Sequence, residues 1–188
     1  ADMDGDGLRD LIIGNKDHQL ASENYGAVFL IPATRILSLP TAPFTSGVKP
    51  AQEHFFQDPA SPGLFRLNGK TPQGLFGASI ARVPLLGGGG RDAIVVGSPG
   101  SDVGGVAKTG GAFVFRHKVD GAGFDPKPIA VISGETYRAG GGLGHRVAAT
   151  LLGGVPTVSI GSPSGTPFES PDIVDNGTAY TVQFPLNP

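Results

Sequence analysis

The residues best suited to chemistry form an acidic stretch at the start of the chain, Asp2-Met3-Asp4-Gly5-Asp6-Gly7-Leu8-Arg9-Asp10. Its carboxylates occupy loop positions 1, 3, 5 and 9, and its two glycines stand where a tight turn needs a positive φ. Carboxylates at this density repel one another unless a hard cation that prefers oxygen ligands lies among them. Calcium fits the set better than magnesium, which is usually held by one or two carboxylates together with water or phosphate.

The stretch therefore predicts a Ca²⁺ site built from side-chain and backbone oxygens. The expected ligands are the carboxylates of Asp2, Asp4 and Asp6, the backbone carbonyl of Leu8, and the carboxylate of Asp10, which closes the shell. An EF-hand loop opens in the same way, but its twelfth position is a bidentate Glu that leads into a helix. Here the twelfth position is Ile13, inside an apolar run that predicts a strand. The alternative without a metal is a solvated acidic turn.

Composition excludes several classes of function. The 188 residues carry a formal net charge of −2 and the pI is about 6.1, which gives no electrostatic case for nucleic acid. No apolar run approaches the roughly 18 residues of a membrane span. The residues from Ala1 do not show a signal-peptide pattern, so we expect a mature chain, a trimmed chain or a fragment. The absence of cysteine excludes disulfides and thiolate metal sites. The expected calcium loop favours an extracellular or cell-surface location, with the periplasm as an alternative, because weaker calcium modules fill at the concentrations outside cells.

The pattern of apolar runs predicts an all-β protein. The 31 glycines and 17 prolines punctuate short β-rich runs, and no stretch offers convincing helical periodicity. A long proline-rich insert lies between about residues 32 and 62 and carries His54-Phe55-Phe56. These aromatic residues could form a binding edge or cover an edge strand, and the sequence leaves both readings open.

The strand pattern repeats along the chain with a period near 65 residues. Each unit contains four short strands joined by turns rich in glycine and proline. The aligned pairs are Leu75–Ala81 with Gly142–Ala148, Ala93–Pro99 with Thr157–Pro163, Gly110–Phe115 with Asn176–Thr181, and Leu64–Gly69 with Ile129–Gly134. Leu11–Gly14 and Gly26–Ile31 match the second and third strands of the unit. A four-stranded unit repeated at this spacing is typical of a β-propeller blade.

The units resemble the FG-GAP repeat of integrin α-subunit propellers and of many bacterial surface proteins. The resemblance rests on the Phe76-Gly77 opening, the Gly-Ser-Pro that begins at Gly97 and again at Gly161, and the D-x-D-x-D-G-x-x-D loop. Two positions depart from the pattern, since Gly14-Asn15-Lys16 lacks the proline and Leu143 replaces the phenylalanine.

In the family the calcium loop joins the first and second strands of a blade. The resemblance therefore implies one β-propeller domain with blades of four antiparallel strands, about three blades in this chain, incomplete at both ends. The expected blades cover about residues 1–69, 70–136 and 137–188.

The resemblance also implies a function. We expect a calcium-stabilised extracellular binding or adhesion module that recognises a protein or glycan through loops on one face. Three units of four strands less two give ten strands, so another chain or fragment should complete the propeller; an open β-solenoid fragment is the rival. The pattern carries over no catalytic or cofactor-binding residue. The alternative function is the propeller part of a secreted or surface hydrolase or lyase whose active site lies mostly outside this chain.

Overall fold

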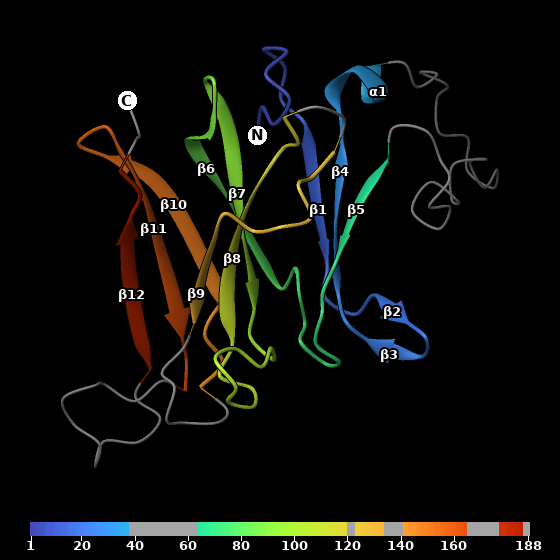
Figure 1. The fold of residues 1–188 in the computed structure, drawn as a ribbon, viewed down its shortest axis with the longest axis vertical. Coiled ribbons are helices and arrows are strands. Elements are labelled where there is room, and N and C mark those ends of the chain that lie inside the picture. The colour runs from blue at the N-terminus through green and yellow to red at the C-terminus, as the bar shows by residue number, and fades with distance from the viewer. Residues whose placement is uncertain (38–63, 120–122, 134–140, 165–176, 186–188) are drawn as a thin grey trace, which may run out of the picture.

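Three antiparallel sheets dominate the computed structural model (Figure 1), which describes residues 1–37, 64–119, 123–133, 141–164 and 177–185. The N-terminal sheet has the order β1 (Leu11–Asn15), β4 (Ala27–Ile31), β5 (Phe65–Asn68). The central sheet contains β6 (Ser79–Gly88), β7 (Arg91–Ser98), β8 (Gly111–Arg116) and β9 (Ala130–Ser133) in chain order. The C-terminal sheet contains β10 (Arg146–Leu152), β11 (Val155–Ser162) and β12 (Thr178–Gln183).

The all-β class predicted from the sequence is confirmed, because the described strands pair antiparallel in all three sheets. The central sheet is a four-stranded meander, as expected for one repeat unit. The described sheets do not close into a ring, so the β-propeller itself stays a prediction.

Two small elements differ from the expectation. A two-stranded hairpin of β2 (Gln19–Leu20) and β3 (Glu23–Asn24) forms part of the connection from β1 to β4. A five-residue helix, α1 (Ala33–Leu37), follows β4. A single helical turn is too short to show the periodicity that reveals a helix in a sequence. The remainder of the proline-rich insert, including His54-Phe55-Phe56, lies outside the described residues.

The same backbone contact joins both neighbouring pairs of sheets. Gly26 forms a parallel bridge with Phe76, and Gly110 forms one with Leu143. In each case the apolar residue donates its backbone N–H to the carbonyl before the glycine, over 3.2 Å from Phe76 to Tyr25 and 3.0 Å from Leu143 to Thr109. Both glycines have a positive φ, 78° and 74°. The Phe-Gly opening of one unit is therefore a contact with the unit before it.

A second repeated contact explains the glycine of the Gly-Ser-Pro element. A Cβ added at Gly14 would clash with the carbonyl oxygen of Gly77, and one added at Gly97 would clash with that of Gly144. In addition, the Ser79 hydroxyl donates to the Gly144 carbonyl over 2.8 Å. Two successive sheets thus approach through backbone atoms, which only glycine permits at these positions.

The structure corrects one repeat alignment by a single residue. Gly97 pairs with Ala112 and Gly161 pairs with Ala179, so Gly110 corresponds to Gly177 rather than to Asn176. Gly110 and Gly177 share almost the same φ, 74° and 73°. The physical reason is that the turn before this strand needs a residue in the left-handed region.

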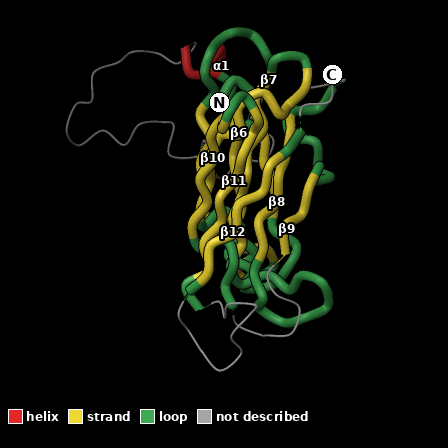
Figure 2. Tube along the Cα trace, turned by 90° about the vertical axis from the view of Figure 1, so that its left-hand side faces the viewer, coloured by secondary structure: helices red, strands yellow, loops and turns green. Residues whose placement is uncertain are grey.

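Apolar cores fill the spaces between the sheets. Strands run along the long axis of the molecule and their connections gather at its two ends (Figures 1 and 2). In β4, Val28 and Leu30 pack toward the central sheet, whereas alternate residues such as Phe29 join a separate cluster. The core between the central and C-terminal sheets includes Val95 and Ile160. Each such side chain stabilises the fold by about 1.5–3 kcal/mol when it is fully buried. In the described part of the chain, no helix has the length and apolar character that crossing a membrane requires.

Candidate metal centre

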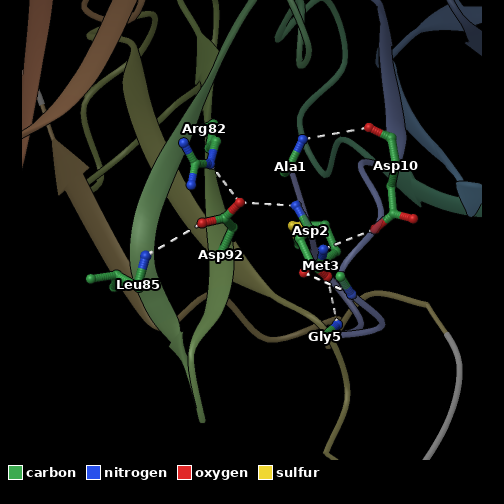
Figure 3. Close-up of polar contacts among 9 residues, drawn as sticks. Ala1, Asp2, Met3, Gly5, Asp10, Arg82, Leu85 and Asp92 are labelled. Atoms are coloured by element: carbon green, nitrogen blue, oxygen red, sulfur yellow. Dashed lines mark hydrogen bonds and ion pairs between the residues drawn. The ribbon is translucent and has the colours of Figure 1, made fainter.

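The acidic loop lies at the end of the N-terminal sheet, directly before β1, and faces the β6–β7 hairpin of the central sheet (Figure 3). Met3 anchors it, since this side chain is fully buried in the apolar core between the two sheets. The N–H of Asp10 donates to the carbonyl of Ala1 over 2.6 Å and closes the loop at its base. The anchored methionine and the closed base hold the polar residues between them in a compact turn.

Three of the predicted ligands converge within this loop. One carboxylate oxygen each from Asp2, Asp4 and Asp10 lies within 4.8 Å of the other two. Calcium binds oxygen at about 2.3–2.6 Å, so two ligand atoms on one ion are at most about 5 Å apart. The spacing of these three oxygens therefore fits a shared calcium ion, and the donors are of the type that calcium selects.

Asp10 is the buried member of the group, with 6% of its surface exposed. One carboxylate oxygen accepts the N–H of Met3 over 2.8 Å and the other accepts the N–H of Ala33 over 3.0 Å. Burial raises the pKa of Asp10 above its usual value; these two hydrogen bonds oppose the rise, and the charges of Asp4 and Asp6 add to it. Such a carboxylate, desolvated beside like charges, gains from a cation at this point.

Backbone N–H groups shape the rest of the loop around the carboxylates. Asp2 accepts the N–H of Gly5 over 2.8 Å and that of Gly7 over 3.1 Å, through different oxygens. Both glycines adopt a φ of 85°, which confirms the expected positive φ. These bonds use one lone pair of each oxygen and leave the other for a further partner.

The remaining predicted ligands are placed differently. Asp6 is exposed, accepts the N–H of Leu8 over 2.7 Å, and does not belong to the group of three converging carboxylates. The N–H of Asp6 in turn donates to Asp4 over 3.1 Å. The side chain of Leu8 is exposed. The roles of Asp6 and Leu8 as ligands stay predictions.

The structure adds a residue that the sequence reasoning missed, Asp92 at the start of β7. One oxygen of its buried carboxylate accepts the N–H of Asp2 over 2.9 Å and the Nε–H of Arg82 over 2.5 Å. The N–H of Asp92 donates to the carbonyl of Asp2 over 2.9 Å, so Asp92 holds the Asp2 backbone through both its carboxylate and its own N–H. Burial alone would raise the pKa of Asp92, but the hydrogen bonds from Arg82 and from Asp2 lower it. No local motif could reveal a partner 90 residues away.

We expect Asp92→Ala to weaken calcium binding by roughly tenfold, because residues that orient metal ligands typically contribute 10–100-fold to metal affinity. The variant removes the acceptor that fixes the backbone of Asp2. Isothermal titration with calcium chloride measures the effect, and Asp17→Ala, an exposed carboxylate paired only with Lys16 among the described residues, is the control. Equal affinities for Asp92→Ala and wild type would exclude a positioning role for Asp92.

A separate cavity of about 480 Å³ lies between β5 and the central sheet. Phe76, Phe113 and Phe115 line it, with Arg66 and Lys70 among its polar residues. The ring of Phe76 meets the other two edge-on, with centroids 6.1 and 5.8 Å away. Its remaining residues come partly from the segment after β5 and from the loop after β7. Its size and largely apolar character are typical of a site that receives a small ligand or a side chain.

Comparison with known proteins gives no assignment for this geometry. No protein-family model matches the chain, and no curated protein matches it significantly.

Proposed function

We propose that this chain is part of a calcium-stabilised binding or adhesion module of the FG-GAP, integrin-like β-propeller type. The observation that carries the proposal is the convergence of the Asp2, Asp4 and Asp10 carboxylates in a loop held between two sheets. The repeated glycine contacts at both sheet interfaces support the tandem-unit architecture on which the resemblance to FG-GAP proteins depends. A calcium site of this kind favours an extracellular or cell-surface location.

The proposed role of calcium is structural. Asp2, Asp4 and Asp10 would hold the ion, together with Asp6 and the carbonyl of Leu8. When bound, the ion supplies positive charge that offsets the repulsion among the carboxylates. The chain's own residues then keep the loop in place: Met3 through its burial, and Asp10 through its bonds to the N–H groups of Met3 and Ala33.

Recognition would be the task of loops on one face, with a protein or a glycan as ligand. The cavity beside Phe113 and Phe115 supports this part of the proposal, because it combines aromatic walls with polar groups. Further strands, from another chain or another segment, would complete the propeller beyond the three described sheets.

Removal of calcium tests the metal site directly. We expect chelation to destabilise the protein by about 2.7 kcal/mol, relative to calcium at a hundredfold above its dissociation constant, because the ion binds the folded state only. For a chain of this length, that corresponds to a fall of roughly 5–10 °C in the midpoint of thermal unfolding. Calorimetry in calcium and in EGTA measures it, with magnesium as the ion control. Identical unfolding curves in both buffers would contradict the proposal.

Binding assays against immobilised glycans and surface proteins separate a recognition module from an enzyme. The proposal expects saturable binding without turnover. Turnover of a polysaccharide that a single Asp or Glu substitution abolishes would replace it with the alternative of a hydrolase or lyase.

A further inference from the structure

We propose that the C-terminal sheet carries an open docking socket for another four-stranded repeat unit, lined by Gly161, Ser162, Gly177 and Thr178. The partner is identified by its chemistry: it opens with an apolar residue followed by glycine, as Phe76-Gly77 and Leu143-Gly144 do in this chain. This inference rests on the proposed repeat architecture and specifies which kind of unit packs against the C-terminal sheet.

Two filled sockets define what an occupied one looks like. In the central sheet, Gly97 lies against the carbonyl of Gly144, and Gly110 bridges Leu143. In the N-terminal sheet, Gly14 lies against the carbonyl of Gly77, and Gly26 bridges Phe76. Each socket therefore consists of a strand glycine that admits a backbone carbonyl and a positive-φ glycine that pairs with the incoming segment.

The C-terminal sheet has the same two glycines with no unit against them among the described residues. A Cβ added at Gly161 would lie 3.8 Å from the carbonyl oxygen of Arg146 on the same sheet, and no other described sheet approaches it within 4 Å. A Cβ added at Gly177, whose φ is 73°, would lie 3.3 Å from the carbonyl oxygen of Pro163, which directly follows β11. A depression of about 420 Å³ occupies the place that Leu143 and Gly144 fill in the socket before it.

One polar contact of the filled socket recurs in the open one, and two polar side chains of the open socket differ from it. The Ser162 hydroxyl donates to the carbonyl of Gly141, as Ser98 does to the carbonyl of Gly74 over 2.7 Å. Arg146 stands where Ser79 binds the incoming Gly144 carbonyl in the central sheet, and its Nη1 now donates to its own neighbour, His145, over 2.9 Å. The Thr178 hydroxyl oxygen is buried without a hydrogen-bond partner in the described part of the chain.

The surface beside the socket indicates the kind of unit that fits. On the central sheet, Val95 and Val114 face the C-terminal sheet and belong to a fully apolar core. Pairing places Ser159 and Thr181 at the corresponding positions of the C-terminal sheet, where both are exposed and their hydroxyls lie 3.2 Å apart. Small polar residues allow a close approach but leave hydroxyls that need partners. The C-terminal sheet packs an apolar face against Val95 of the central sheet. The docking unit should pack a more polar face against Ser159 and Thr181.

In the described part of the chain, both segments of the required type already occupy sockets. The occupant is therefore an additional unit rather than Phe76-Gly77 or Leu143-Gly144 of the same molecule. A second copy of the chain could enter only by releasing one of these buried segments, in which Phe76 is 4% and Leu143 0% exposed.

A peptide with the sequence of residues 73–82, Gln-Gly-Leu-Phe-Gly-Ala-Ser-Ile-Ala-Arg, is the probe. Titrated to millimolar concentration into the isotope-labelled full chain, it should shift the amide signals of Gly161 and Gly177 in a saturable manner. Gly161→Val should reduce the affinity at least tenfold, because its side chain fills the place of the incoming carbonyl. A peptide with valine in place of its second glycine should not bind, since that residue needs the positive φ of 89° seen at Gly77.

Thr150→Val is the matched control, because it places the same valine side chain at an exposed position on the same face of the sheet, away from the socket. This variant should bind the peptide as wild type does. Absence of shifts at Gly161, or shifts that persist in Gly161→Val, would overturn the proposal. Self-association of the chain that Gly161→Val abolishes would overturn it too, in favour of a second copy. If calcium binding fails while the peptide binds, the metal proposal falls and the socket stands.

Discussion

Asp10→Ala should lower the thermal unfolding midpoint both in calcium and in EGTA. The decrease should be larger in calcium, so that the difference between the two conditions disappears. The variant deletes a converging carboxylate, so the calcium contribution of about 2.7 kcal/mol at a hundredfold excess of the ion is lost. It also leaves the buried N–H groups of Met3 and Ala33 without their acceptor, at about 1–3 kcal/mol for each. Differential scanning calorimetry in the two buffers separates these effects, because only the first depends on the ion.

Two further variants give this prediction its controls. Asp10→Asn keeps the side-chain shape and one carbonyl acceptor, so it should lose the calcium effect and cost less in EGTA than Asp10→Ala. Asp6→Ala should leave most of the calcium effect in place, since the Asp6 carboxylate lies outside the converging group. A full calcium effect in Asp10→Ala would contradict the assignment of Asp10 as a ligand, and a complete loss in Asp6→Ala would mean that Asp6 contributes as much as the converging carboxylates.

The sequence predicts features whose residues lie close together in the chain. It does not predict contacts between residues that only folding brings together. The acidic loop and the repeated strands could be predicted because their signals lie within a few residues: alternating carboxylates, Phe-Gly and Gly-Ser-Pro. Asp92 could not, because nothing within its own hairpin refers to Asp2. The one-residue error at Asn176 has a similar origin. Several residues in that stretch suit a turn, and the sheet pairing of Gly161 with Ala179 decides which of them takes the positive φ.

Glycines were the hardest residues to interpret from sequence. In the structure they form the close backbone contacts between successive sheets. Gly97 looks like strand punctuation in the sequence, yet its Cα faces the backbone of the next unit. The meaning of such a glycine depends on whether a neighbour occupies the space beside it. Gly97 and Gly161 hold equivalent places in successive units. Among the described residues a neighbouring unit contacts Gly97 and none contacts Gly161, which allows a direct comparison.

Gly97→Ala should destabilise the protein by about 3 kcal/mol or more, whereas Gly161→Ala should change stability by less than about 0.5 kcal/mol. The methyl group at position 97 would overlap the carbonyl oxygen of Gly144 and the hydroxyl of Ser79. Neither atom can withdraw easily, because the Ser79 hydroxyl donates to that same carbonyl across the interface. The sheets must then move apart, which opens the apolar core that contains Val95 and Ile160.

Urea denaturation of the two variants measures both free energies of unfolding under one set of conditions. Both substitutions replace glycine with alanine in equivalent strands, so differences in strand propensity and in unfolded-chain entropy largely cancel. What remains in the difference between them is the close approach of a neighbouring unit. Equal costs for Gly97→Ala and Gly161→Ala would mean that strand geometry alone selects these glycines. The contact between successive units, and with it the argument for the open socket at Gly161, would then lose its physical basis.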